Sequence, residues 1–386
     1  MTEGTVDLAE LRIRAMAASD KEAGSYALFG DHQLFLADTA TQTVVELATL
    51  PNILEIRHYS GYASETKNSR EDTDLEISLI FHHPYICVVE RYGLNAALCN
   101  IDTKKVCELK REDYCCEVSS YSVGFVEREG RTLLVCQTQW NRLDIFDAES
   151  GENLTEREVS RREIGRTAMY PIFEDKNYID YFHSKLHIAP DGKHFLSNGW
   201  IWHPAGRVRL FDTDRFFSSF EPSSIEVGYQ YNNAWDLPCT FIDNNLFVIV
   251  MDNQRSTGLM SIEEEEVYVY KQLAFFRVNG MCAETKSEFG VHRWLDSCGE
   301  FVASIFPFDK AGEIKGLLYY DKAAERLVAL TLSGAFAVSL SGEILDSISD
   351  ICYGSPPTWD YTPVHNVFYM WQDGIGIVER QFESGK

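Results

Sequence analysis

The sequence feature that most constrains the fold is a recurring unit, in which a short apolar strand ends in Asp and a tight polar turn leads into a second strand. The clearest copy runs from Asn141 to Gly151, where Ile145 and Phe146 precede Asp147 and the turn Ala-Glu-Ser-Gly follows. Weaker copies are anchored at four further aspartates: Asp38, Asp102, Asp212 and Asp321. The pattern predicts a chain made of hairpins that repeat along its length.

The spacing of these hairpins, roughly 40 to 50 residues, is typical of a β-propeller, because a lone four-stranded blade cannot bury both of its faces. Period-2 alternation is widespread and long helical periodicity is scarce, so we expect an all-β chain. The 386 residues fit a single propeller domain over 1–386, with seven blades of about 50 residues each. Six or eight blades stay open, because Leu317–Leu330 and Gly334–Ile348 fit one blade or two.

Two stretches define individual blades. The segment from Lys185 to Asp212 is interpreted as three successive strands, since the Pro-Asp-Gly turn at 190–192 supplies a fixed φ and a permissive glycine. The last strand pair flanks Gln372–Gly374, and we expect it to share one blade with the N-terminal segment at 11–16. Such closure would remove exposed strand edges.

The strand-end Asp with its polar turn, best seen in Asp144–Glu152, and the Pro-Asp-Gly hairpin resemble the tryptophan-aspartate repeat propellers and their divergent relatives. Phe146 and Phe211 stand at positions where those repeats have Trp. The resemblance implies a rigid propeller whose loops and top face bind a protein or peptide. A non-catalytic scaffold of this kind is the leading functional hypothesis.

Charge and composition exclude several classes of partner. The formal net charge is −24, and a field this negative opposes the phosphate neutralisation on which nucleic-acid binding depends. It equally disfavours anionic membrane surfaces, and no apolar run approaches the roughly 20 residues of a membrane span. We therefore expect a cytoplasmic protein whose partner is another protein or peptide, one that is basic if the acidic runs take part.

No motif for hydrolytic, phosphate-binding or dinucleotide chemistry is present, and no cofactor is predicted. A weak set of metal-ligand candidates is His183, His187, His203 and Asp180. On a strand, His183 and His187 would share a face but lie about 13 Å apart at 3.3 Å per residue, so ordinary structural roles are favoured for them. A divalent metal in the central channel, as in propeller lactonases, leaves little local trace. A metal-dependent hydrolase or lyase is therefore the alternative function.

Aromatic residues supply the binding candidates. Trp200 and Trp202 flank Ile201 and would share one face of a strand, where packing between blades is the ordinary role. The loop-like run from Tyr229 to Trp235 carries side chains that commonly anchor interfaces. The candidate binding residues are Tyr229, Tyr231, Asn232, Trp235, Asp236, Trp200 and Trp202. The same platforms suit a carbohydrate or small-ligand sensor, which is the third hypothesis.

Overall fold

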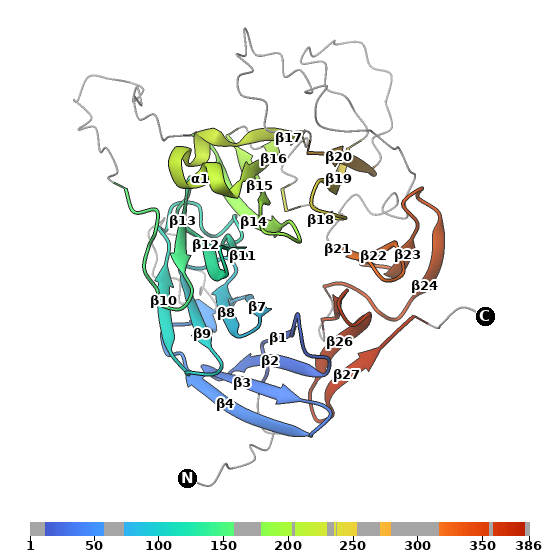
Figure 1. Ribbon diagram of the computed structural model, residues 1–386. Coiled ribbons are helices and arrows are strands. Elements are labelled where there is room, and N and C mark those ends of the chain that lie inside the picture. Colours follow the sequence, from blue (N-terminus) through green and yellow to red (C-terminus); the bar gives the residue numbers. More distant parts are fainter. Residues whose placement is uncertain are drawn as a thin grey trace, which may run out of the picture.

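The computed structural model describes nine stretches of the chain: residues 12–57, 73–157, 179–202, 205–229, 235–236, 238–252, 271–278, 316–354 and 358–382. Within them, seven antiparallel sheets of three or four strands follow one another along the chain. Figure 1 shows these sheets, here called blades 1 to 7, arranged in a ring. The strand run 317–348 forms one blade, which settles the ambiguity in favour of seven.

Within each blade the strands pair in chain order. Blades 1 to 3 comprise β1 (Ala15–Ala18), β2 (Ser25–Gly30), β3 (Gln33–Asp38), β4 (Thr43–Thr49), β7 (Ile77–His82), β8 (Tyr85–Glu90), β9 (Asn95–Asn100), β10 (Val106–Lys110), β11 (Val123–Arg128), β12 (Arg131–Gln139) and β13 (Arg142–Asp147). Blades 4 and 5 comprise β14 (Phe182–Ile188), β15 (His194–Ile201), β16 (Ala205–Asp212), β17 (Ile225–Tyr229), β18 (Cys239–Phe241), β19 (Leu246–Asp252) and β20 (Lys271–Arg277). Blades 6 and 7 comprise β21 (Leu317–Asp321), β22 (Arg326–Thr331), β23 (Gly334–Val338), β24 (Ile344–Ile348), β25 (Asp360–Thr362), β26 (Val367–Gln372) and β27 (Gly376–Arg380). A short pair, β5 (Ile56–Arg57) and β6 (Thr73–Asp74), lies between blades 1 and 2.

The strands expected within 185–212 are β14, β15 and β16, and the Pro-Asp-Gly turn joins β14 to β15 as the sequence indicated. Two helical turns were not anticipated: α1 (Thr213–Ser219) and the 3-10 turn η2 (Glu221–Ser223). The carboxylate of Asp212 caps α1 by accepting a hydrogen bond from the Arg215 amide at 2.9 Å. The strand-end Asp therefore starts a helix here instead of a hairpin turn.

The strand-end acids share one hydrogen bond, from the backbone amide three residues later to Oδ1. It is 2.8 Å for Asp38 and Thr41, 2.8 Å for Asp147 and Ser150, and 3.1 Å for Asp321 and Ala324. In blade 2 the acceptor is Asn100, not Asp102, whose own amide donates to it at 2.9 Å. The side chain closes the turn by replacing a backbone acceptor, which explains the repeat in the sequence. Asp321 differs in place, since it ends the first strand of its blade and the others end the third.

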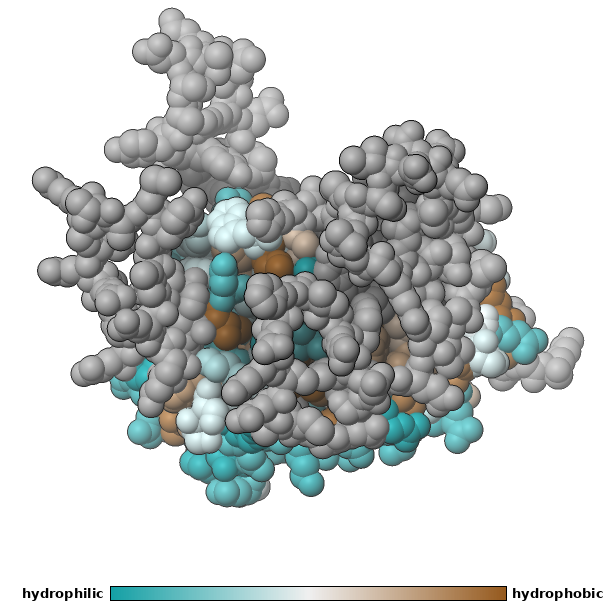
Figure 2. All heavy atoms as spheres, turned by 90° about the horizontal axis from the view of Figure 1, so that it is seen from above, coloured by the Kyte–Doolittle hydropathy of each residue, from teal (hydrophilic) through white to brown (hydrophobic). Residues whose placement is uncertain are grey.

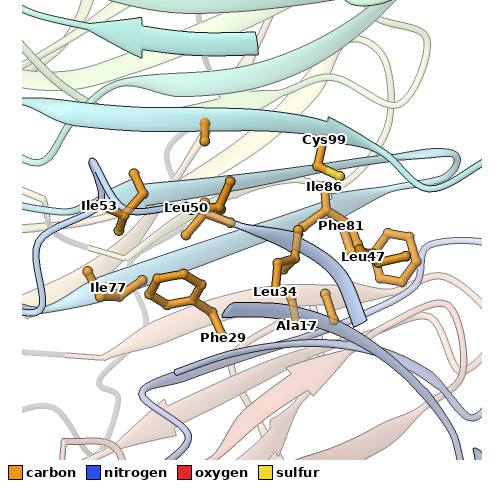
Figure 3. Close-up of a cluster of buried hydrophobic side chains, with 13 residues drawn as sticks. Ala17, Phe29, Leu34, Leu47, Leu50, Ile53, Ile77, Phe81, Ile86 and Cys99 are labelled. Carbon is orange, nitrogen blue, oxygen red and sulfur yellow. The ribbon is translucent and has the colours of Figure 1, made fainter. Parts of the chain in front are cut away.

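Each blade is buried on both faces. In β2, Ala27 and Phe29 pack toward blade 2, and the alternate residues Tyr26 and Leu28 pack toward blade 7. Successive strand residues point to opposite faces, so a strand between two neighbours is apolar throughout. Figure 3 shows Phe29 among the side chains that join blades 1 and 2. Each buried side chain of this size contributes about 1.5 to 3 kcal/mol relative to exposure.

The ring is closed by side chains of blade 1 that pack against blade 7. Tyr26 of blade 1 meets Tyr369 of blade 7 with ring centroids 5.4 Å apart, and its hydroxyl donates to Glu379 at 2.5 Å. Figure 1 shows the first and last blades side by side. The expected composite blade is not found among the described strands: β1 pairs with β2, and β25 to β27 form their own sheet. Among the described residues, apolar packing between blades 1 and 7 joins the two ends of the ring.

The meander gives the ring two distinct faces. The first-to-second and third-to-fourth turns lie on one face, and the Asp-ended turns occupy it. The second-to-third turns and the connections between blades lie on the opposite one, called here the top face. Trp140 in the β12–β13 turn, Trp202 after β15 and Trp235 before β18 all belong to the top face.

Candidate binding surface

A continuous cluster of aromatic rings lies on the top face over blades 3 and 4. The rings are those of Tyr114, Trp140, Phe182, Trp200, Trp202 and Trp235, and together with Val118, whose carbonyl accepts the Trp235 indole, they are called here the aromatic patch. The exposed part consists of Tyr114 and Trp202, each 47% accessible, and Val118 at 38%. Large apolar side chains exposed together mark an interaction site more often than scattered ones do.

Phe182, at the start of β14, is the centre of the patch. Its ring stacks on Trp200 with centroids 3.8 Å apart and an interplanar angle of 8°. The Trp140 ring centroid lies 4.4 Å from that of Phe182, and the Trp202 ring lies nearly perpendicular to Phe182 with centroids 5.3 Å apart. Trp235 stacks on Trp200 at 5.2 Å. Offset-stacked and edge-to-face arrangements are the favoured ones, so the cluster is held in one geometry before any partner arrives.

Gly199 on β15 permits this stacking. A Cβ built there would lie 1.9 Å from the Phe182 carbonyl oxygen, so β14 can approach β15 only because residue 199 is glycine. The register of the two strands shifts between Phe182 and Lys185 at the same place. The Tyr181 hydroxyl accepts the Gly199 amide at 2.7 Å and donates to the Ser197 carbonyl at 2.6 Å.

Hydrogen bonds tie the rings to the connection between β10 and β11. The Trp200 indole donates to Ser119 Oγ at 2.8 Å, and the Trp235 indole donates to the Val118 carbonyl at 2.7 Å. That connection is itself held by buried Arg111, whose guanidinium donates to the Cys116 and Ser119 carbonyls, each at 2.9 Å. Charge-assisted bonds of this kind make the connection rigid.

Asp236 links the patch to the wall of the channel. Its carboxylate accepts the Ser120 hydroxyl at 2.6 Å and the Lys185 amide at 3.1 Å. Beside it lies a cavity of 140 Å³. The cavity is lined by Lys185, His187, Asp236, Pro238, Cys239, Thr240, Gly316, Leu317, Leu318 and Tyr319. The channel wall therefore carries both polar and apolar groups next to the patch.

Burial shifts the pKa of two titratable groups in this wall, Lys185 and Asp360. Burial, reinforced by the charge of Arg91, lowers the pKa of Lys185, and burial raises the pKa of Asp360. The Asp360 carboxylate accepts hydrogen bonds from the hydroxyls of Tyr319 and Tyr369. Desolvation thus shifts the pKa of both Lys185 and Asp360, and the charge of each partly opposes the shift of the other.

The histidine candidates for metal binding occupy separate positions. His183 is fully buried, and its Nδ1 lies 3.0 Å from Ser197 Oγ. Burial lowers the pKa of both His183 and His187 to about 3, so each ring is neutral. Asp180 is exposed, and His203 lies outside the described residues. In the described part of the chain, no three His, Cys, Asp or Glu side chains gather in a geometry that could hold a metal ion.

Some of the aromatic candidates from the sequence lie together in the structure, and others lie outside the described residues. The structure brings Trp200, Trp202 and Trp235 together, with the first two rings 5.5 Å apart. Tyr231 and Asn232 lie outside the described residues, as does the side chain of Tyr229. Sequence reasoning missed Tyr114, Trp140 and Phe182, because contacts between different blades leave no local signal. The only available hint was their residue type.

The described surface in Figure 2 contains both hydrophilic and apolar residues. Hydrophilic residues gather along the lower rim of the described surface in that view, with apolar residues between them. Among the helices that the structure describes, none has the length and apolar character to cross a bilayer.

Comparison with solved structures finds chains of similar fold. Hydrazine synthase of Kuenenia stuttgartiensis matches over 100% of this chain and 99% of its own, with a TM-score of 0.56 and 12% identity. The chain has the fold of a seven-bladed β-propeller. The β-propeller domain of Myceliophteria thermophila Cps50 (Swd1) has a TM-score of 0.54 at 10% identity, covering 98% of this chain and 99% of that one. A chain of a mitotic checkpoint complex has a TM-score of 0.50 at 12% identity, covering 98% and 91%.

These likenesses confirm the propeller fold expected from the tryptophan-aspartate-like turns. No protein-family model matches the sequence. No curated protein matches it either. Since propellers carry many unrelated functions, the function of this chain has to be argued from its own surface.

Proposed function

We propose that the protein is a non-catalytic scaffold that binds a protein or peptide segment at the aromatic patch of its top face. The observation that carries the proposal is the preformed stack around Phe182, which leaves Trp202, Tyr114 and Val118 exposed. Interfaces obtain most of their binding energy from a few aromatic anchors. Rings that are already ordered lose little entropy on binding, so such a patch binds more tightly than its area suggests.

The rigid support favours the same role. The β10–β11 connection is fixed by Arg111, and the Trp200 and Trp235 indoles are both hydrogen bonded to it. Binding residues are commonly found on loops that a stable scaffold holds in place. The cytoplasmic location expected from the sequence belongs to the same proposal.

The test compares proteins captured from a lysate of the native cell by three purified forms. The patch variant is Tyr114→Ala with Trp202→Ala. The control variant is Ile344→Ala with Leu345→Ala, which removes two apolar side chains of similar exposure, 48% and 53%, from the outer strand β24 of blade 6. We expect the wild type and the control to retain the same specific protein, and the patch variant to lose it.

Capture that is equal in all three forms would contradict the proposal. A neutral oligosaccharide that quenches Trp fluorescence in the wild type and the control, but not in the patch variant, would support the sensor hypothesis instead. In either case the folded state of each variant is checked by its near-ultraviolet circular dichroism.

A further inference from the structure

Acidic side chains lie beside Tyr114 and Val118 of the aromatic patch. The segment 111–120, which carries Tyr114 and Val118, has three exposed acids: Glu112, Asp113 and Glu117. A fourth exposed acid, Asp180, precedes β14. Burial raises the pKa of the Tyr114 hydroxyl, and the charges of Cys115 and then Asp180 raise it further. These four residues are called here the acidic rim.

The only basic residue of the segment does not offset this charge at the surface. The Arg111 side chain is 3% accessible and points inward, toward the Gly93 carbonyl at 2.8 Å and the Gln137 side chain at 2.8 Å. Its guanidinium also lies 4.7 Å from the centre of the Tyr121 ring. All exposed charged side chains of the segment are therefore acidic, and they lie next to exposed Tyr114 and Val118.

Resting on the proposed function, we infer that the patch takes a basic peptide segment in which Arg or Lys side chains flank an apolar one. The apolar side chain packs on Trp202 and Val118, and the flanking cations face the acidic rim. A guanidinium can also lie over the exposed ring of Tyr114 or Trp202. Complementary charge speeds association and rejects acidic competitors, because like charges facing each other are repelled.

The chemistry separates this partner from others. A neutral sugar has no positive charge to pair with the four carboxylates, and an acidic peptide or a nucleic acid would be repelled by them. The net charge of −24 adds a long-range attraction for cationic segments, which salt screens over about 8 Å at physiological ionic strength. We therefore expect affinity for the basic segment to fall as salt is added.

The experiment measures fluorescence anisotropy with three short labelled peptides in which Leu alternates with Arg, Gln or Glu. For the wild type we expect the Arg peptide to bind at least about tenfold more tightly than the Gln peptide, with no binding of the Glu peptide at roughly 100 µM. The patch variant Tyr114→Ala with Trp202→Ala should lose affinity for the Arg and Gln peptides alike.

The charge test uses two matched variants. Asp113→Lys with Glu117→Lys reverses two charges of the rim. Glu149→Lys with Glu152→Lys reverses two exposed charges in the β13 hairpin turn on the opposite face. Both change the net charge equally, but we expect only the rim variant to weaken the Arg peptide, by about tenfold.

Equal binding of all three peptides, no binding of the Arg peptide, or equal weakening by both charge variants would overturn the inference. Failure of the proposed function looks different, because the patch variant would then retain its captured partner. A neutral or acidic native partner that needs Trp202 would leave the proposed function standing and refute the basic segment.

Discussion

At the scale of the residue, one hydrogen bond explains the most visible pattern in the sequence. Asp147 accepts bonds from the Ser150 amide at 2.8 Å, the Glu149 amide at 3.1 Å and the Ser150 hydroxyl at 3.0 Å. The bond from the Ser150 amide, followed by that from the Ser150 hydroxyl and the charge of Arg131, holds the pKa of Asp147 below its usual value against the opposing effect of burial. Asp38, Asp147 and Asp321 therefore act as turn-closing groups.

Replacing Asp147 tests this account. Asp147→Ala should lower the free energy of unfolding by about 1 to 2 kcal/mol, measured by urea denaturation at pH 7. Asp147→Asn keeps the Oδ1 acceptor and should cost much less. A lowered folded pKa stabilises the fold above the unfolded pKa of about 3.9, and that contribution is lost as the pH falls through the folded pKa. The difference between wild type and Asp147→Ala should therefore shrink below about pH 4, and a constant difference would contradict the role of the charge.

At the scale of the element, the sequence predicts strands better than it predicts which strands meet. The strands of blade 4 follow from alternation and the Pro-Asp-Gly turn, both of which are local. The helix α1 was missed because it is short and its signal is a single capping Asp. The patch could be anticipated only at Trp200, Trp202 and Trp235, since Tyr114 and Trp140 reach it from the β10–β11 connection and blade 3.

Gly199 shows how an element positions the patch. Gly199→Ala places a methyl group against the Phe182 carbonyl and the Tyr181 ring, so β14 must move away from β15. We expect a loss of about 1 to 3 kcal/mol in stability and a weaker near-ultraviolet aromatic signal, because Phe182 would no longer stack closely on Trp200. An unchanged aromatic spectrum with wild-type stability would show that the strand contact does not set the stack.

At the scale of the whole molecule, blades are joined on the face opposite the patch by a charged bridge. His82 in blade 2 contacts Asp20 of blade 1 at 2.6 Å and Glu127 of blade 3 at 2.8 Å. Burial disfavours the charged ring, but the hydrogen bonds and charges of the two carboxylates outweigh it and raise the pKa of His82. The positive charge of Lys21 also lowers the pKa of both carboxylates, Asp20 and Glu127. The neighbouring His83 ring lies 3.7 Å from the carboxylate of Glu22.

This bridge predicts a pH dependence. Because the folded pKa of His82 is raised, its contribution to stability is fully present below the unfolded pKa of about 6.5 and is lost as the pH rises through the folded pKa. In the wild type the His82 ring stacks on Phe125 with ring centroids 5.1 Å apart. His82→Phe keeps an aromatic ring at this position but removes the charge. We expect the variant to unfold at a lower temperature than the wild type at pH 5.5, with a smaller difference at pH 9. A larger difference at pH 9 would reverse the sign and contradict the bridge.

The whole ring also presents the patch as one rigid surface, which is the central claim. The most direct measurement places a photo-cross-linking amino acid at Val118 and, as a control, at Ile344, both exposed, in the native cell. We predict that position 118 cross-links to one protein at a short segment with Arg or Lys beside an apolar residue, and that position 344 does not. No specific cross-link at 118, or the same products from both positions, would contradict the assignment of the top-face patch as the binding surface.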